Sequence, residues 1–523
     1  MAKVLVIGAG VGGATTAALL AQAGHAVTVL EAHIDPGGCA STFFHKGYRF
    51  DAGATLAGGF HEGGPHHIVG QILNLTWKVQ PVNPAWVVHL PDRTVTQYGT
   101  SEEREAEFAR AFGDTADGTR VLRFFKEVET VSDAVWDFAA RRPAWPPSNL
   151  RDLIQVATAL RPKTLIALPH VLETMGGWAR RSGVHDSAAL TFLDAQLLIS
   201  AQTTANKASA LFGAAAADLP RKGVTHPEGG IGGISEQLVE AIRGFGGQVH
   251  FRQEVTKLDV KAGRITGAHT NKGAHFECDV CIANLTPWDL ARVLGDSAPT
   301  TLSSETQRRP DEWGAFTLYL GVDDDDRRRG SEAVTTDDTN PIVSESDHHQ
   351  VVADYAQPLG ETNSIFMSFS APNDLKRAPA GHRAVTISTH TNLAEWWRLR
   401  DTVGAQAAYD ERKALYAERM LDNAETVFPD LRSRIRLQLE GTPVTFKFYT
   451  RRHKGGVGGF PFTSLFQARG PWTGLRNAWL VGDSIFPGQS TAGVTMGAMR
   501  VADEVLRAFP KSQTSAIRFA ADV

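Results

Sequence analysis

The first 31 residues constrain the fold of this chain more than any other stretch. A short apolar run rich in β-branched residues, 3–7, leads directly into the glycine turn 8–13. An alanine-rich helical stretch then runs to Gly24, and a second apolar run, 26–30, ends at the acid Glu31. Strand, glycine turn, helix, strand and acid, in this order, form the fingerprint of a βαβ dinucleotide site.

Each part of this fingerprint has a mechanical reason. We expect Gly8 to form the tight turn, Gly10 to let a pyrophosphate approach the backbone, and Gly13 to let the helix lie close to the strand. The helix N-terminus offers free N–H groups and the positive end of its dipole to phosphates. Glu31 lies 18 residues after Gly13, where its carboxylate can accept a hydrogen bond from a ribose 2′-OH. The alternative is an ordinary strand–helix turn that binds nothing.

Composition sets the class of protein. A chain of 523 residues is expected to form two or more domains, and 42% hydrophobic with 21% charged residues is typical of a globular protein. The net charge of −4 provides no global basic field for nucleic acid. A cleaved signal peptide would remove the dinucleotide strand, and no apolar run approaches the ~18 residues that span a bilayer. We therefore expect a cytoplasmic protein that is at most peripheral to a membrane.

The cysteines and histidines give no sign of a metal site. Only three cysteines occur, Cys39, Cys278 and Cys281, which excludes a disulfide framework. Cys278 and Cys281 have redox or metal spacing, but in the strand-like run 276–283 they would face opposite sides, so we interpret them as buried small residues. His61, His66 and His67 have no distant set of ligands to complete a site. We predict that the chain holds no metal.

A second informative pattern lies near the C-terminus. The predicted strand 479–481 runs into Gly482-Asp483, and a helix with alanines and methionines follows the segment 493–495 and continues to about Ala508. We expect Asp483 to hold a polyol hydroxyl and the amides of residues 493–495 to cap a pyrophosphate. A C-cap glycine beside a surface acid is the alternative. Two contact segments so far apart in the sequence suit FAD better than NAD, because an extended flavin needs a second contact.

The middle of the chain predicts regular elements and some loops. Helical spacing occurs at 101–142 and 234–245, and short strands are predicted at 249–251, 255–260, 265–269 and 276–283. We interpret the charge run 323–329 as a solvated loop, residues 331–350 as a mobile polar excursion, and the tail after Pro510 as loose.

These motifs together resemble a known family. The further segments that carry the resemblance are Gly37-Gly38, 50–55, 227–230, Glu254-Val255, Asn284 and 482–493. The chain is similar, over essentially its whole length, to the flavin-dependent carotenoid desaturase/isomerase family of the phytoene desaturase type. Segments 37–42, 63–67 and 142–149 are most similar to the carotenoid 3′,4′-desaturase branch. Many members carry a basic residue directly after the glycine pair, where this chain has Cys39, so backbone amides have to bind more of the pyrophosphate.

The resemblance implies an α/β fold. It has a discontinuous Rossmann-type, amine-oxidase-like FAD-binding domain, an inserted mixed α+β substrate domain and a helical membrane-facing segment. The expected boundaries are 1–75, 225–300 and 475–508 for the FAD-binding domain, 76–224 and 301–474 for the substrate domain, and 509–523 for a loose tail. The residues expected to bind FAD are Gly8, Gly10, Gly12, Gly13, Glu31, Ala32, Gly38, Cys39, Ser41, Thr42, Gly53, Ala54, Thr55, Val255, Asn284, Gly482, Asp483, Gly493, Val494 and Thr495.

The implied carotenoid substrate in turn implies a membrane. Burying a CH₂ group is worth ~0.8 kcal/mol, so carrying such a molecule through water would cost tens of kcal/mol. In residues 141–181, basic side chains and the tryptophans Trp145 and Trp178 alternate with branched aliphatic ones, which is typical of an interfacial, monotopic segment. A helical pair packed on the substrate domain is the alternative.

Side chains alone cannot oxidise a bond between saturated carbons, so hydride transfer to flavin N5 is expected. We leave the catalytic residues unidentified, and interpret the histidines at 61, 66 and 67 and the basic run 451–453 as loop or surface groups. No second nucleotide fingerprint follows a strand, which favours a quinone or oxygen as electron acceptor. The preferred activity is desaturation near the end of an acyclic or monocyclic carotenoid. The alternatives are a flavin-dependent cis–trans isomerase, a non-catalytic prenyl-lipid-binding protein and, less favoured, an amine oxidase.

Overall fold

The computed structural model describes residues 1–309, 313–324, 349–354, 358–372, 374–461 and 463–510. The polar excursion expected at 331–350 lies outside these residues up to position 348, and its last two residues begin strand β16 (His349–Ala353). The tail expected to be loose also lies outside them from residue 511. Of the charge run, Asp323 ends strand β15 (Trp313–Asp323), and 325–329 lie outside the described part.

A five-stranded parallel sheet brings together three distant parts of the chain. Its order is β10 (Gln248–His250), β2 (Ala26–Leu30), β1 (Lys3–Ile7), β14 (Val280–Ala283) and β20 (Ala478–Leu480). Val6 in the central strand pairs with Val29 on one side and Ile282 on the other, and Ile282 pairs with Trp479. The strands are short apolar runs because both faces of a parallel sheet are covered.

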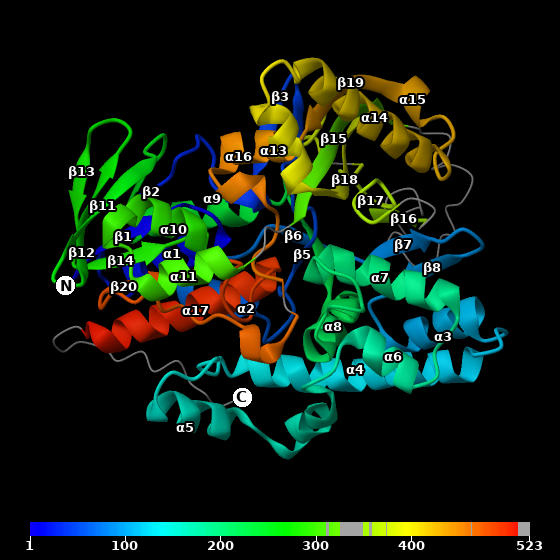
Figure 1. The fold of residues 1–523 in the computed structure, drawn as a ribbon, viewed down its shortest axis with the longest axis horizontal. Helices are drawn as coiled ribbons and strands as arrows, with labels where there is room; N and C mark the ends of the chain where they lie inside the picture. The colour runs from blue at the N-terminus through cyan, green and yellow to red at the C-terminus, as the bar shows by residue number, and fades with distance from the viewer. Residues whose placement is uncertain (310–312, 325–348, 355–357, 373, 462, 511–523) are drawn as a thin grey trace.

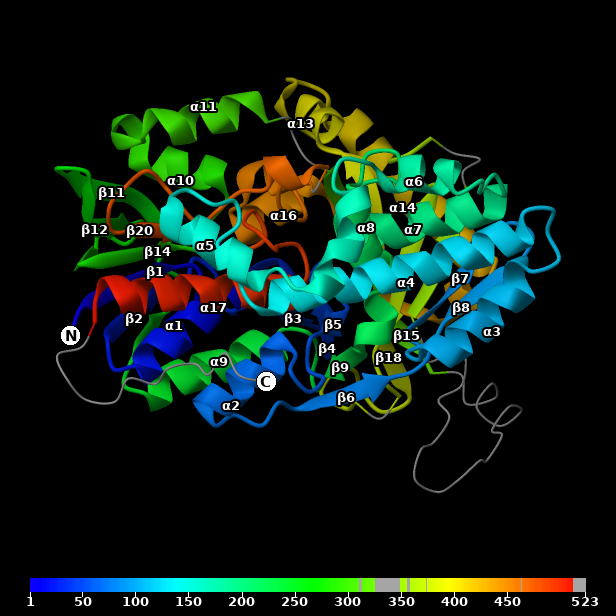
Figure 2. The same ribbon diagram turned by 90° about the horizontal axis from the view of Figure 1, so that it is seen from below.

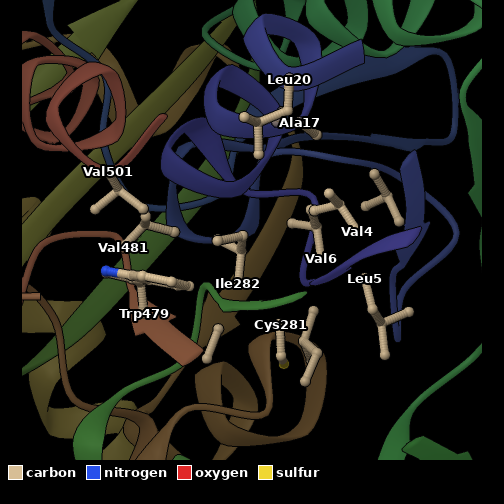
Figure 3. Close-up of a cluster of buried hydrophobic side chains, with 14 of the residues drawn as sticks. Val4, Leu5, Val6, Ala17, Leu20, Cys281, Ile282, Trp479, Val481 and Val501 are labelled. Carbon is tan, nitrogen blue, oxygen red and sulfur yellow. The ribbon is translucent and has the colours of Figure 1, made fainter. Parts of the chain in front are cut away.

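Three helices pack together beside this sheet: α1 (Val11–Gln22), α9 (Gly233–Gly244) and α17 (Thr491–Ala508). Figure 1 and Figure 2 show α17, the red helix near the C-terminus, alongside the blue α1. Figure 3 shows Leu20 of α1, Ile282 of β14 and Val501 of α17 in one buried cluster. A Cβ atom on Gly13 would lie 2.1 Å from the carbonyl oxygen of Gly8, so the expected close approach of helix and strand is confirmed.

The strand predicted at 276–283 is wrong as a single element. The structure divides it into β13 (His275–Glu277) and β14, which belong to different sheets. At the division, the N–H of Cys278 donates to Thr266 and the N–H of Asp279 donates to Lys3, so the chain changes hydrogen-bonding partners there. Strand β13 pairs with β12 (Arg264–Thr270), which pairs with β11 (Val255–Lys261). Cys278 and Cys281 are both free and buried, as expected.

A seven-stranded sheet forms the second large layer. Its order is β19 (Ile435–Gly441), β15, β18 (His382–Asn392), β17 (Ser364–Phe369), β16, β7 (Trp86–His89) and β8 (Thr94–Gln97). One face packs on helix α14 (Gln406–Glu425), where Phe316 and Leu318 meet Tyr416. Because side chains alternate along a strand, Ala315 and Tyr319 belong to the opposite face.

The other elements comprise a helical layer, two small sheets and further helices. The helical layer contains α3 (Ser101–Phe112), α4 (Gly118–Ala140), α5 (Leu150–Ala159), η2 (Pro162–His170), α6 (Met175–Arg181), α7 (Ser187–Ala201), α8 (Ala210–Ala217) and η3 (Leu219–Lys222). The small sheets pair β3 (Thr42–His45) with β4 (Tyr48–Asp51), and β5 (Ala57–Gly58) and β6 (Val79–Val82) with β9 (Val224–Pro227). The remaining helices are η1 (Gly38–Ala40), α2 (Pro65–Leu73), α10 (Pro287–Leu294), η4 (Gly295–Ser297), α11 (Thr300–Arg308), α13 (Leu393–Asp401), α15 (Leu431–Arg434), α16 (Pro443–Thr450), η6 (His453–Gly455) and η7 (Leu465–Gln467). Within the described ranges, no helix has both the length and the apolar character needed to cross a bilayer.

His66 is a core residue rather than the loop histidine that we expected. It lies in α2 with an exposed fraction of 0%, and its ring stacks on Phe60 at 4.4 Å between centroids. Trp77 contacts the same ring edge-on at 5.4 Å. Burial lowers the pKa of His66 to about 3, so the imidazole is neutral in the folded protein at ordinary pH.

This burial predicts a pH-dependent loss of stability. The unfolded chain binds a proton at His66 below about pH 6.5, whereas the folded chain does not until about pH 3, so stability falls as the pH is lowered through this window. Between pH 8 and pH 5 the wild type is expected to lose about 2 kcal/mol more unfolding free energy than His66→Gln, at roughly 1.4 kcal/mol for each pH unit. Urea denaturation at the two pH values measures the difference. Equal losses in both proteins would contradict the prediction.

Candidate functional site

A cavity of about 930 Å³ is lined by both ends of the chain. The glycine turn contributes Gly8, Gly10 and Gly12, and the C-terminal segment contributes Asp483 and Val494. The opposite wall comes from the seven-stranded sheet. Ligand pockets usually measure about 300–1,000 Å³, so this cavity lies at the upper end of the range and has room for a large ligand.

The glycines of the turn form a cradle that no side chain could share. A Cβ atom on Gly10 would lie 2.6 Å from Nδ2 of Asn284, and one on Gly12 would lie 3.0 Å from the backbone nitrogen of Gly482. Gly8 has a φ of +92°, which favours glycine. The N-terminal turn, the end of β14 and the end of β20 therefore meet at one edge of the cavity, with backbone atoms exposed to it. This arrangement fits a pyrophosphate at the N-terminus of α1.

Glu31 is fixed at the end of β2. Its Oε2 accepts a hydrogen bond from the N–H of Ala9 at 2.7 Å, and its Oε1 accepts one from the N–H of His33 at 2.8 Å. Burial raises the pKa of Glu31, and these two N–H donors oppose the rise because they stabilise the carboxylate. The carboxylate is thus held beside the glycine turn, where we expect it to accept a hydrogen bond from a ribose 2′-OH.

An arginine from a distant part of the chain lies in the cavity wall near Cys39. Arg452 forms an ion pair with Asp483 at 2.9 Å and donates to the carbonyl oxygens of Gly456 and Gly458. Burial raises the pKa of the Cys39 thiol, and the nearby Arg452 guanidinium opposes that rise. The sequence suggested a surface role for the run 451–453, so the place of Arg452 in the cavity wall is a correction that only the fold reveals.

Most of the residues predicted to bind FAD line this cavity. Those that line it are Gly8, Gly10, Gly12, Glu31, Ala32, Gly38, Cys39, Ser41, Gly53, Ala54, Thr55, Val255, Asn284, Gly482, Asp483 and Val494. Those that do not are Gly13, Thr42, Gly493 and Thr495. Whether the lining residues bind FAD stays a prediction.

Hydrogen bonds within the protein involve three of the residues predicted to bind FAD: Thr42, Gly493 and Val494. Helix α17 begins at Thr491, so the N–H of Gly493 donates to Oγ of Ser490 at 3.0 Å and the N–H of Val494 donates to its carbonyl oxygen at 2.8 Å. The helix therefore starts earlier than expected, and the capping of a pyrophosphate by these amides stays a prediction. Thr42 has a structural role, because its Oγ1 donates to Asp51 at 2.8 Å and accepts from the N–H of Gly232 at 2.9 Å.

The wall formed by the seven-stranded sheet was missed by the sequence analysis. Tyr319 of β15, Phe366 of β17 and His390 of β18 line the cavity. The hydroxyl of Tyr319 donates to the carbonyl oxygen of Ala52 at 2.5 Å, and burial raises its pKa. Each of these residues lies within a strand, and no recognisable sequence motif surrounds it. The only signal in the sequence is that every second residue of such strands faces the same side.

A smaller cavity of about 80 Å³ lies against the first. Ser200, Leu219, Gln489 and Ser490 line both cavities. The other lining residues of the smaller cavity are mostly apolar and come from α4, α8 and the start of α17. The smaller cavity therefore lies next to the first one and beside α4, the helix against which η2 packs.

The segment expected to face a membrane is exposed only in part. Eight large apolar side chains between 150 and 172 are between 44% and 86% exposed: Leu150, Leu153, Ile154, Leu160, Leu165, Ile166, Leu168 and Leu172. In contrast, Trp178 is 0% exposed, and Nε1 of Trp145 donates to the carbonyl oxygen of Leu465 at 2.9 Å. The expectation of an interfacial position is therefore wrong for the buried Trp178, and for the half-buried Trp145 it stays a prediction.

Comparisons with known proteins agree with this geometry. Residues 6–69 match a model described as an NAD(P)-binding Rossmann-like domain. Over 99% of the chain, the sequence is 26% identical to a chloroplastic prolycopene isomerase of Daucus carota, of which the match covers 82%. It is 23% identical to a 4,4'-diapophytoene desaturase of Methylomonas sp., over 93% of this chain and 91% of that one. A solved structure of putrescine oxidase superposes with a TM-score of 0.61 at 14% identity, covering 97% of this chain and 99% of that one.

Glu31 provides a test of the cofactor site. In Glu31→Gln the side chain keeps its shape, but its NH₂ group then faces the N–H of either Ala9 or His33 as a second donor. The ribose hydroxyl of FAD also loses its charged acceptor. Losing a hydrogen bond to a charged group costs about 1.5–3 kcal/mol, so we expect FAD to bind at least about tenfold more weakly. Titration of the apoprotein with FAD, followed by flavin fluorescence, measures the affinity.

The matched control is Glu277→Gln, which makes the same change on the exposed strand β13, where Glu277 pairs only with Lys3 among the described residues. This control should bind FAD like the wild type. Wild-type affinity in Glu31→Gln would refute the assigned role of the carboxylate.

The fold is that of the FAD-dependent amine oxidases, and the supported cofactor is FAD. The chain is therefore an FAD-dependent oxidoreductase and a homologue of the carotenoid isomerases and desaturases.

Proposed function

We propose that the protein is an FAD-dependent carotenoid desaturase that removes two hydrogens near the end of an acyclic or monocyclic carotenoid, like a 3′,4′-desaturase. The observation that carries this proposal is one cavity lined by the glycine turn, the C-terminal segment and the wall of the second sheet. Such a cavity can hold a flavin against an apolar substrate. The names of the relatives give the substrate class.

The chain's own residues would bind and orient FAD. The turn at Gly8–Gly12 lies at the N-terminus of α1 and is suited to the pyrophosphate, while Glu31 is suited to the ribose. Asp483 and Arg452 form an ion pair near Cys39 and are suited to the polyol. When bound, FAD supplies the hydride acceptor that side chains lack. We retain the proposed division into a discontinuous FAD-binding domain (1–75, 225–300 and 475–508) and a substrate domain (76–224 and 301–474).

The wall opposite the glycine turn is suited to a polyene. Leu198 and Ile199 of α7, Phe366 of β17 and Leu439 of β19 contribute apolar side chains to the cavity. These residues would hold the end of the polyene and exclude water from the bond that is oxidised. The smaller cavity beside α4 would accept more of the long chain.

We further propose that the enzyme takes its substrate from a membrane through residues 150–172. Helix α5 has its polarity inverted, because Asp152 is 7% exposed while Leu150, Leu153 and Ile154 are at least 53% exposed. Oδ2 of Asp152 accepts hydrogen bonds from the N–H and the hydroxyl of Ser148, which holds this orientation. The exposed bases Arg151, Arg161 and Lys163 flank the apolar surface, as in an interfacial helix. In Figure 1 the helix α5 lies at the edge of the molecule, beyond α4 and α17.

The electron acceptor in this proposal is a quinone or oxygen. No further glycine fingerprint follows a strand in the sequence, and both acceptors reach a flavin without a second nucleotide site. A quinone would share the membrane with the substrate.

Cis–trans isomerisation of a carotene is the second candidate. The observation in its favour is the 26% identity to the prolycopene isomerase, against 23% to the diapophytoene desaturase. The two reactions differ in mass balance, because isomerisation leaves the formula unchanged and desaturation removes two hydrogens.

Expression in a carotenoid-accumulating host separates the candidates. We expect products that are lighter by two hydrogens, with absorption shifted to the red because the conjugated chain is longer. Gly10→Val is the inactive control, since its Cβ would lie 2.6 Å from Asn284 and fill the cradle. Products of unchanged mass would establish the isomerase instead, and unchanged carotenoids with flavin-free protein would exclude both activities.

A flotation assay tests the membrane proposal. The wild type is expected to float with anionic liposomes, and Leu165→Glu with Ile166→Glu is expected to stay in solution because two charges would enter the lipid face. The control carries Leu375→Glu and Val403→Glu, which replace side chains that are 71% and 101% exposed outside the segment. The proposal fails if the wild type stays in solution or if both double variants float alike.

A further inference from the structure

We propose that His390 accepts the proton that the carotenoid loses during desaturation, and that Gln202 fixes its imidazole in the required tautomer. This inference rests on the proposed function and assigns the base that the sequence left unidentified. His390 lies in the cavity wall, on strand β18, and is far in the sequence from the glycine turn 8–13.

The alternation of β18 turns His390 towards the cavity. Thr389 and Thr391 belong to the other face, where their hydroxyls donate to the carbonyl oxygen of Ser364 at 2.7 Å and to the hydroxyl of Tyr416 at 2.9 Å. His390 lies between them in the sequence and therefore points to the opposite side. Its ring meets Trp313 edge-on, at 6.4 Å between centroids.

A single hydrogen bond determines which nitrogen of His390 carries the proton. Nε2 lies 2.7 Å from Oε1 of Gln202. An amide oxygen can only accept, so Nε2 is the protonated nitrogen and the lone pair is on Nδ1. Among the described residues, no group forms a hydrogen bond with Nδ1 of His390. This atom is not fully enclosed by protein atoms, so it is open to the cavity.

The orientation of the Gln202 amide is itself fixed. Its Nε2 donates to the carbonyl oxygen of Ile199 at 3.2 Å, so exchanging the amide oxygen and nitrogen would place two acceptors together. Gln202 has a φ of +55° at the end of α7, and Gly458 packs against it so closely that a Cβ there would lie 2.7 Å from its Cγ. The loop that contains Arg452 and Gly458 thus holds both the ion pair with Asp483 and the amide that orients His390.

His390 is also available as a base in the folded protein. Burial lowers its pKa to about 4, so the imidazole is neutral near pH 7. Two ionisable groups of the wall are engaged: Tyr319 donates to Ala52, and Glu440 pairs with Lys413. A weak base is sufficient, because a carbon next to a developing polyene cation releases its proton readily.

The reaction balances with FAD as the oxidant. At one carbon the C–H bond breaks and its electron pair leaves with the hydrogen as a hydride, which reduces the oxidised flavin. At the neighbouring carbon the C–H bond breaks, its electron pair forms the new C=C bond, and the proton forms an N–H bond at Nδ1 of His390. The imidazolium then returns its proton to water. FAD would supply the two-electron acceptor for the hydride, and a quinone or oxygen would take these electrons away.

The test uses the purified holoenzyme and the variants His390→Gln, His390→Gly and Gln202→Leu. In His390→Gln, an amide N–H can still donate to Gln202 while the basic nitrogen is lost. Anaerobic reduction of the flavin by the carotenoid is expected to slow by about 10²–10⁴-fold, the usual contribution of a general base. Binding of FAD and of the carotenoid, read from absorption spectra, should stay near wild type. Added imidazole should restore part of the rate in His390→Gly.

A second readout does not depend on activity. In protein labelled with [¹⁵N]histidine, the signal that disappears in His390→Gln should show a protonated Nε2 and a bare Nδ1 at neutral pH. In Gln202→Leu this signal should shift towards a mixture of tautomers. The control His275→Gln makes the same substitution on the exposed strand β13 and should keep the wild-type rate.

The outcomes separate this inference from the proposed function. If the wild type makes no dehydrogenated product, desaturation fails, whatever the tautomer. If the wild type desaturates and His390→Gln reduces its flavin equally fast, His390 is not the base. A bare Nε2 in the wild type, or no rescue of a slow His390→Gly by imidazole, would also overturn the assignment.

Discussion

The central position of strand β1 is the constraint on which the structure depends. Residues 3–7 pair with β2 on one side and with β14 on the other, and β14 in turn pairs with β20. In a parallel sheet, all the carboxyl ends meet at one edge, which therefore gathers Gly8, Glu31, Asn284 and Gly482. The tight contacts of the glycine turn with Asn284 and Gly482 leave backbone, rather than side chains, facing the cavity.

Much of the cofactor half could be predicted from the sequence because its signals are local. Strand, turn, helix and acid follow one another within 31 residues, and the glycine and acid at 482–483 repeat part of that pattern. The sequence-based predictions were wrong where one local pattern is compatible with two different structures. The run 276–283 reads as one strand, yet it changes sheets at Cys278, and Gly493 reads as a helix start, yet Ser490 already caps α17.

The substrate half could not be predicted in the same way, because its functional residues have no motif. Arg452 lies close enough to Cys39 to influence its thiol, and only tertiary contacts bring the two together. His66 sits among loop-forming residues in the sequence but is buried against Phe60. His390 is one of eleven residues in a long strand, and its meaning comes from Gln202, which lies 188 positions earlier.

The order in which the sheet can assemble follows from its topology. Strand β20 is formed by residues 478–480 and α17 by residues 491–508, so the last wall of the cavity is synthesised almost at the end of the chain. A ribosome-bound polypeptide therefore has the glycine turn long before it has the segment that closes over it. A flavin bound between the two segments could therefore be enclosed only after both have been synthesised.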